Sequence, residues 1–224
     1  MKNPPLLAAT VLAALLVAAP ALPPAKAQSA QEPSCEKLLS KVSDVLGQTE
    51  FLRARFRHEL HSKALGQNEV EEGVLTLARG GRMRWEYTLP PGKLALSDGR
   101  NSYLVLPDQK TVYVQPLPQG REAPLPLRLL MGAVRLKEEF ACEGAVPAGS
   151  LVELALDPAQ PAEGVQKVRV SVDPATGEVR EVRYEDALGN DVSLKLDDVT
   201  HPGQVPVTFF RFVAPAGYRV VEGG

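Results

Sequence analysis

Three histidines and two cysteines are the residues of this chain that could bind a metal ion or act as nucleophiles. His58 and His61 are three residues apart, which would place both on one face of a helix, but the surrounding sequence predicts a strand, where they face opposite sides. His201 precedes a proline in a predicted turn. Cys35 and Cys142 lack the spacing of zinc-finger ligands. We therefore expect no metal site and no cofactor.

Motifs of nucleotide-binding proteins and common hydrolases are absent from the sequence. It contains no G-x-S-x-G elbow, no Walker loop and no G-x-G-x-x-G turn. Most acidic residues alternate with Arg and Lys, which is typical of solvent-exposed strand faces, and the net charge of -2 gives no broad positive field for nucleic acid. We expect neither an enzyme nor a nucleic-acid-binding protein. A hydrolase with scattered catalytic residues is the alternative, and it would require polar residues on the predicted inward faces.

The start of the chain predicts export. Lys2 precedes an apolar run, Leu6 to Val17, of the length of a signal-peptide core and too short for a good membrane span. Ala25-Lys26-Ala27 is an A-x-A cleavage site. Residues 1–27 are therefore predicted to be a signal peptide and residues 28–224 a single domain, with an N-terminal membrane anchor as the alternative.

Export would place the two cysteines in an oxidising compartment. A disulfide between Cys35 and Cys142 would close a loop of about 107 residues and contribute up to about 4.7 kcal/mol in the chain-entropy model. Two free thiols are the alternative. Lipidation of Cys35 is not expected, because Glu32-Pro33-Ser34 differs from the small or apolar residues that precede a lipid-modified cysteine.

One helix is predicted near the start of the exported chain. Ser34 can cap it, Glu36 lies in its first turn and Gly47 can end it. Its apolar residues form a single stripe: Leu38, Leu39, Val42, Val45 and Leu46. We expect this helix to pack on another element.

Alternating apolar residues predict about ten or eleven strands in the rest of the chain. The predicted strands are 52–60, 75–77, 83–87, 94–96, 103–106, 111–114, 151–156, 165–172, 178–184, 192–196 and 207–213. Twenty prolines and 18 glycines suit the many turns between them. Two neighbouring strands have apolar faces formed by Leu75, Leu77, Met83, Trp85 and Tyr87, which could line either a filled core or a cavity.

A short apolar segment separates the two groups of predicted strands. Pro-rich coil leads into a short predicted helix that contains Leu127, Leu129, Leu130 and Met131 and is bounded by Gly132. Such a helix needs an apolar face to lie on. It could plug the sheet permanently or act as a lid that leaves when a ligand enters.

The order of several short motifs resembles the family of periplasmic carriers of outer-membrane lipoproteins, the localisation-factor A carriers. The resemblance runs from about residue 36 to 220 and includes Phe56-Arg57-His58, where the family usually has Gln in the third position. It continues with the order Gly, Arg79, Trp85 and closes with Val207–Phe212 before Pro215-Ala216-Gly217. The family commonly has Pro after the arginine, whereas this chain has glycines.

The resemblance implies a half-closed antiparallel β-barrel whose concave face is covered by helices. A cavity between them would accept the acyl chains of a lipoprotein from an inner-membrane ABC transporter, and the carrier, a monomer, would deliver it across the periplasm to an outer-membrane acceptor. The implied cavity residues are Phe56, Leu75, Leu77, Met83, Trp85, Tyr87 and Tyr103, and the implied lid residues are Leu127, Leu129, Leu130 and Met131. Arg79 would hold the lid closed through hydrogen bonds to its carbonyl groups.

Two other functions could use the same half-barrel. A regulatory module would bind a lipid signal and a protein partner, and such proteins usually carry an extra domain. An outer-membrane acceptor would need an anchoring cysteine at the cleavage site and usually a protruding apolar loop. The carrier is the function that the motifs favour.

Overall fold

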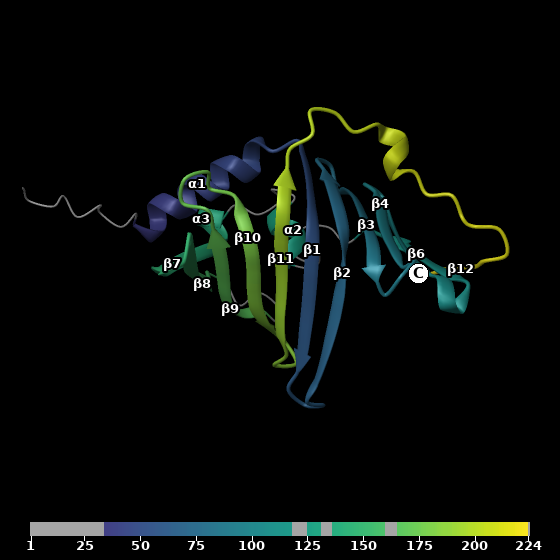
Figure 1. Ribbon diagram of the computed structural model, residues 1–224, viewed down its shortest axis with the longest axis horizontal. Helices are drawn as coiled ribbons and strands as arrows, with labels where there is room; N and C mark the ends of the chain where they lie inside the picture. Colours follow the sequence, from purple (N-terminus) through teal and green to yellow (C-terminus); the bar gives the residue numbers. More distant parts are fainter. Residues whose placement is uncertain (1–33, 118–124, 131–135, 160–164, 224) are drawn as a thin grey trace, which may run out of the picture. The chain divides into compact units, whose positions relative to one another are not determined.

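A single open sheet organises the described part of the chain. The computed structural model describes residues 34–117, 125–130, 136–159 and 165–223. Within them, twelve strands follow the order β12-β6-β5-β4-β3-β2-β1-β11-β10-β9-β8-β7 (Figure 1). The end strands β12 and β7 are not neighbours, so the sheet does not close on itself. This confirms the predicted mainly β class with an incompletely closed sheet.

The strands form two antiparallel groups that meet at β1 and β11. The first group is β1 (Phe51–Ser62), β2 (Gln67–Ala78), β3 (Arg82–Leu89), β4 (Leu94–Asp98), β5 (Asn101–Leu106) and β6 (Thr111–Pro116). The second group is β7 (Phe140–Ala148), β8 (Leu151–Pro158), β9 (Val165–Val172), β10 (Val179–Asp186) and β11 (Asp191–Thr200). The last strand, β12 (Arg219–Glu222), pairs in parallel with β6.

Three helices share one hydrophobic core with the sheet. They are α1 (Cys35–Gln48), α2 (Leu125–Leu130) and α3 (Leu136–Glu139). Their buried leucines belong to the same cluster as residues from β1, β2, β3 and β8–β11. We call the side of the sheet that contributes to this cluster the interior face and the opposite side the outer face. No helix in the described ranges is long and apolar enough to cross a membrane.

Helix α1 forms where its cap and apolar stripe predict it. The Ser34 side chain accepts a hydrogen bond from the Lys37 backbone N–H at 3.4 Å. Four of the five stripe residues are buried, and Val45 is half-buried. The helix runs past Gly47 and is capped by Thr49, whose N–H and hydroxyl both donate to the Val45 carbonyl. The prediction that Gly47 ends the helix is therefore wrong by one residue.

Replacing the capping serine should weaken α1 slightly. We expect Ser34→Ala to lower the free energy of unfolding by about 0.5–1 kcal/mol, because the first turn loses a side-chain acceptor. Ser43→Ala, on the same helix but away from its start, should cause no loss. Urea unfolding of both variants measures the difference, and equal stabilities would contradict a capping role.

The predicted set of strands differs from the structure in two places. Residues 207–213 are predicted to be a strand, but Val207–Phe210 form a 3₁₀ helix, η3, and the last strand lies later, at β12. The residue before η3 is Pro206, and only Phe210 of η3 is buried. Strand β7 is missing from the predicted set, because Gly144 and Pro147 interrupt its apolar pattern. The strand count therefore rises to twelve in the described ranges.

The segment around η3 packs against the outer face of the first strand group. Phe210 joins a small cluster with Phe51 and Ala78, separate from the main core. The Arg84 guanidinium lies 5.0 Å from the Phe209 ring centroid, in a cation–π arrangement. Part of the outer face of β1–β3, around Phe51, Ala78 and Arg84, is thus covered by aromatic side chains rather than by another strand.

Candidate functional site

Six predicted cavity residues lie together on the interior face. The strand register pairs Leu77 with Met83 and Leu75 with Trp85, and it pairs Ala54 of β1 with Leu75. Directly paired residues of antiparallel strands point to the same face. The residues that this face brings together are Phe56, Leu75, Leu77, Met83, Trp85 and Tyr87.

An aromatic group lies at the centre of this face. The Phe56 ring packs edge-to-face on Trp85 at 4.7 Å and on Tyr87 at 5.2 Å between ring centroids. Gly73, which pairs with both Phe56 and Tyr87, makes room for the rings. A β-carbon at Gly73 would lie 2.9 Å from the Phe56 ring and would also meet the Glu86 carbonyl oxygen. The aromatic packing therefore depends on this glycine.

Tyr103 lies on the outer face, which corrects its assignment to the cavity. It pairs with Leu96, whereas the neighbouring Ala95 pairs with Trp85 on the interior face. Its ring stacks on Phe212 at 4.5 Å, and its hydroxyl donates to Asp98 at 2.9 Å. Tyr103 therefore holds the segment after η3 rather than lining the interior.

The predicted lid helix is present as α2 and is packed onto the interior face. Leu129 is 0% and Leu130 is 2% exposed, and both belong to the main core. The Leu127 side chain and Met131 lie outside the described residues. Arg128 is buried and pairs with Glu139 of α3, so an ion pair links the two short helices.

Arg79 bonds to the end of α1. Its Nε donates to the Thr49 carbonyl at 3.0 Å, and a terminal guanidinium nitrogen donates to the Gly47 carbonyl. Helix α1 has no basic residue in its last turn, so Arg79 supplies the positive charge that a helix C-terminus favours. Within the described residues, the carbonyls that Arg79 holds thus belong to α1 and its cap, whereas the resemblance implies carbonyls of the segment at 127–131.

Glycines and a narrow crevice surround this arginine. Gly80 and Gly81 both adopt positive φ, 78° and 76°, and form the β2–β3 turn after Arg79. A crevice of about 10 Å³ is lined by Arg79 together with Leu52, Leu77 and Leu130 of the main core. Arg79 therefore lies over a seam where α1, α2 and β2 meet.

The apolar part of the interior face is bounded at one end by a row of polar side chains, which the sequence did not predict. This polar row consists of His58, Glu71 and Lys93. Glu71 pairs with His58 across β1 and β2, and the Lys93 ammonium bonds to the Glu71 carboxylate and lies 4.4 Å from the Tyr87 ring centroid. Hydrogen bonds from His58 and Lys93 lower the pKa of Glu71 against the effect of burial, and burial raises the pKa of Tyr87.

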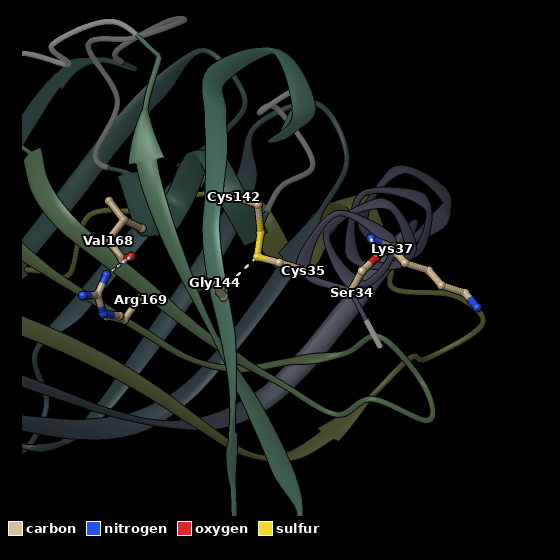
Figure 2. Close-up of a disulfide and its surroundings, with 7 residues drawn as sticks. All are labelled: Ser34, Cys35, Lys37, Cys142, Gly144, Val168 and Arg169. Atoms are coloured by element: carbon tan, nitrogen blue, oxygen red, sulfur yellow. Dashed lines mark hydrogen bonds between the residues drawn. A yellow bond between two sulfur atoms is a disulfide. The ribbon is translucent and has the colours of Figure 1, made fainter. Parts of the chain in front are cut away.

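The two cysteines form a disulfide that fixes the start of α1. Figure 2 shows Cys35, the first residue of α1, bonded to Cys142 of β7. The Cys35 sulfur also lies 3.0 Å from the Gly144 carbonyl oxygen. Because α1 leads directly into β1 at its other end, the helix spans from the edge strand β7 to the middle of the sheet. No group of three or more metal-ligating side chains occurs in the described part of the chain.

Comparisons with known proteins show which family the sequence matches and which solved structure shares the fold. The family model of the outer membrane lipoprotein carrier protein LolA matches residues 47–213. The outer-membrane lipoprotein carrier protein of Chromobacterium violaceum is 30% identical, with 98% of this chain and 97% of that protein covered. That of Bordetella pertussis is 29% identical, with 96% and 97% covered. An uncharacterised conserved protein from Thermus thermophilus, at 12% identity, shares the fold with a TM-score of 0.54 over 84% of this chain and 98% of that one.

Proposed function

Because the chain belongs to the LolA family of outer membrane lipoprotein carriers, we propose that it binds the acyl chains of outer-membrane lipoproteins and carries them across the periplasm. The observation that supports this most directly is the apolar interior face, which is covered by helices rather than by a second sheet. The predicted site residues on this face are apolar, which suits a protein that binds hydrocarbon chains better than one that catalyses a reaction.

The physical task of such a carrier is to keep acyl chains out of water. Each buried CH₂ group is worth about 0.8 kcal/mol, so an anchor with two or three long chains does not leave a membrane unaided. The interior face provides the replacement surface, because it extends over several adjacent strands and is lined by aliphatic and aromatic side chains.

Release requires that binding is not too tight. In the structure, Leu129 and Leu130 of α2 and the stripe of α1 occupy the apolar face. Cargo must displace part of these contacts and the hydrogen bonds of Arg79. The free energy lost in this displacement offsets part of the gain from burying the acyl chains, which leaves a moderate affinity.

The proposal includes the route of the cargo. Residues 1–27 act as a signal peptide that is cleaved near Ala27. The carrier, as a monomer, receives acylated lipoprotein from an inner-membrane ABC transporter and delivers it to an outer-membrane acceptor where one is present. Capture of triacylated lipoprotein by the protein purified from an exporting host tests this route, and a protein that never carries acylated cargo would contradict it.

Changing the arginine should prolong cargo binding. We expect Arg79→Leu to hold a triacylated lipoprotein about tenfold more tightly, because the empty, closed form loses charge-assisted hydrogen bonds to α1. Arg79→Lys keeps the charge but not the planar pair of donors, so it should fall between the variant and the wild type.

The measurement is the rate at which bound lipoprotein passes to acceptor-containing membranes. Arg55→Leu is the matched control, since Arg55 is an exposed arginine on the outer face of β1, paired with Asp198. We expect slower transfer from Arg79→Leu than from this control, and equal transfer rates would show that Arg79 does not regulate the closed form.

A further inference from the structure

The polar row His58, Glu71 and Lys93 stands at the opposite end of the interior face from Arg79. Glu71 of β2 and Arg79, which directly follows β2, are eight residues apart, which corresponds to about 26 Å along a strand. Between them, Leu75 and Leu77 are almost fully buried. The interior face is therefore an apolar surface with a distinct charged group at each end.

The register shows that the polar row shares this face with the aromatic group. His58 follows Phe56 by two residues on β1. Lys93 lies directly before β4 and precedes Ala95 of that strand by two residues. Residues two apart on a strand point to the same face. Lys93 lies beside Tyr87, the outermost member of the aromatic group, and its ammonium reaches both the Tyr87 ring and Glu71.

The two ends differ in how deeply their charged groups are buried. The side chains of His58, Glu71 and Lys93 are 32%, 24% and 19% exposed. At the other end, the short link between α1 and β1 crosses the seam, and Arg79 already donates to two carbonyls at the end of α1. Arg79 is exposed, whereas the polar row is partly buried, so the row both meets water and contacts the apolar residues through Tyr87.

Lys93 has donors to spare for a ligand. An ammonium group carries three N–H donors, and among the described residues the carboxylate of Glu71 is its hydrogen-bond acceptor. Glu71 compensates the charge of Lys93 and orients its amine, and His58 supports Glu71 from the other side at 3.5 Å. A partly buried cation that is held in place beside an apolar surface suits neutral carbonyl oxygens attached to long hydrocarbon chains.

The lengths also match. The hydrocarbon core of a bilayer is about 30 Å thick, so the acyl chains of one leaflet extend about 15 Å. A chain that points toward Arg79 fits within the roughly 26 Å between the two ends. Its carbonyl end then lies near the polar row, and the protein part of the cargo remains in water.

We propose that Lys93, held by Glu71 and His58, binds the ester and amide carbonyl oxygens that join the acyl chains to the first residue of the cargo. This inference rests on the proposed carrier function and identifies where the polar part of the anchor is recognised. Lys93 is then the residue that distinguishes an acylated lipoprotein from an apolar molecule without such carbonyl groups.

Two probes separate the polar row from the apolar face. A synthetic triacylated lipopeptide has both acyl chains and carbonyl groups, whereas N-phenyl-1-naphthylamine is a neutral apolar dye. Trp85 is the single tryptophan of the chain and lies on the interior face, so its fluorescence reports binding of either probe. We expect Lys93→Met to weaken lipopeptide binding about tenfold and to leave dye binding unchanged. Lys93→Arg should bind the lipopeptide like the wild type.

Two further variants keep the test valid if Lys93→Met alone is unstable. The double variant Glu71→Gln with Lys93→Met leaves no unpaired carboxylate and should show the same tenfold loss. Lys195→Met is the matched control, because Lys195 is an exposed lysine on the outer face of β11, and it should bind both probes normally.

The possible results separate the two proposals. Unchanged lipopeptide affinity in Lys93→Met would overturn the role of the polar row while leaving the carrier function intact. Equal losses of affinity for the dye and for the lipopeptide in Lys93→Met and in the double variant would also overturn the role of the polar row. Lys93 would then stabilise the interior face rather than bind the ligand. A wild-type protein that binds no lipopeptide would contradict the carrier function itself.

Discussion

Removing the disulfide should produce the largest loss of stability in this protein. The variant with Cys35→Ser and Cys142→Ser is expected to lose about 4.7 kcal/mol of unfolding free energy. The bond joins residues 107 positions apart, so the unfolded chain gains much conformational freedom without it. The folded state loses as well, since the bond ties α1 to β7, and the two elements are otherwise joined by side-chain packing.

Urea unfolding of the oxidised wild type, the reduced wild type and the double serine variant measures this effect. Reduction and substitution should lower the stability by similar amounts, because both remove the cross-link, whereas only substitution introduces hydroxyl groups. A difference of less than about 1 kcal/mol between the oxidised wild type and both other forms would mean that α1 and β7 are held by packing alone.

The second large effect is expected at Gly73. Replacing it by alanine should lower the free energy of unfolding by about 3 kcal/mol, because the added methyl group meets the Glu86 backbone carbonyl and the Phe56 ring. Backbone cannot move aside as a flexible side chain can. The Phe56 ring must then shift away from Trp85 and Tyr87, so Trp85 fluorescence should change along with the stability.

Gly144→Ala is the matched control for this prediction. Gly144 also lies in a strand, β7, but a β-carbon there would meet no atom within 4 Å. Alanine costs less conformational entropy than glycine on folding, so this variant should match the wild type or gain up to about 1 kcal/mol. Equal effects of the two substitutions would show that space beneath Phe56 is not the limiting factor.

Local patterns were enough to predict most of the elements. The stripe and cap of α1 fall within one stretch of 14 residues, and the strands around Trp85 alternate clearly between apolar and charged residues. Residues 207–213 misled the prediction because Val-Thr-Phe-Phe-Arg-Phe has the composition of a strand. In the structure, these aromatic side chains cover part of the outer face of the first strand group, with Phe210 in the cluster around Phe51. Aromatic content indicates burial, but it does not say in which backbone conformation.

Sites that depend on register could be predicted only in part. The interior residues of β2 and β3 are close in sequence and joined by a short turn, so their common face follows from alternation. Tyr103 is two strands further, and each turn between strands can reverse the face. The polar row is harder still, because His58, Glu71 and Lys93 come from separate strands and only pairing brings them together. One signal was available: His58 occupies a position where related carriers usually have glutamine.

The two edge strands of the sheet, β12 and β7, limit association between molecules through backbone hydrogen bonds. β12 has only four residues, and β7 contains Pro147, which lacks an N–H group. Short or proline-containing margins give an incoming strand few backbone partners, so neither side of the sheet can readily be extended by a second molecule. If loading with acyl chains uncovers the interior face, as the proposed function requires, these margins would keep the protein from assembling into fibrous aggregates through its own backbone.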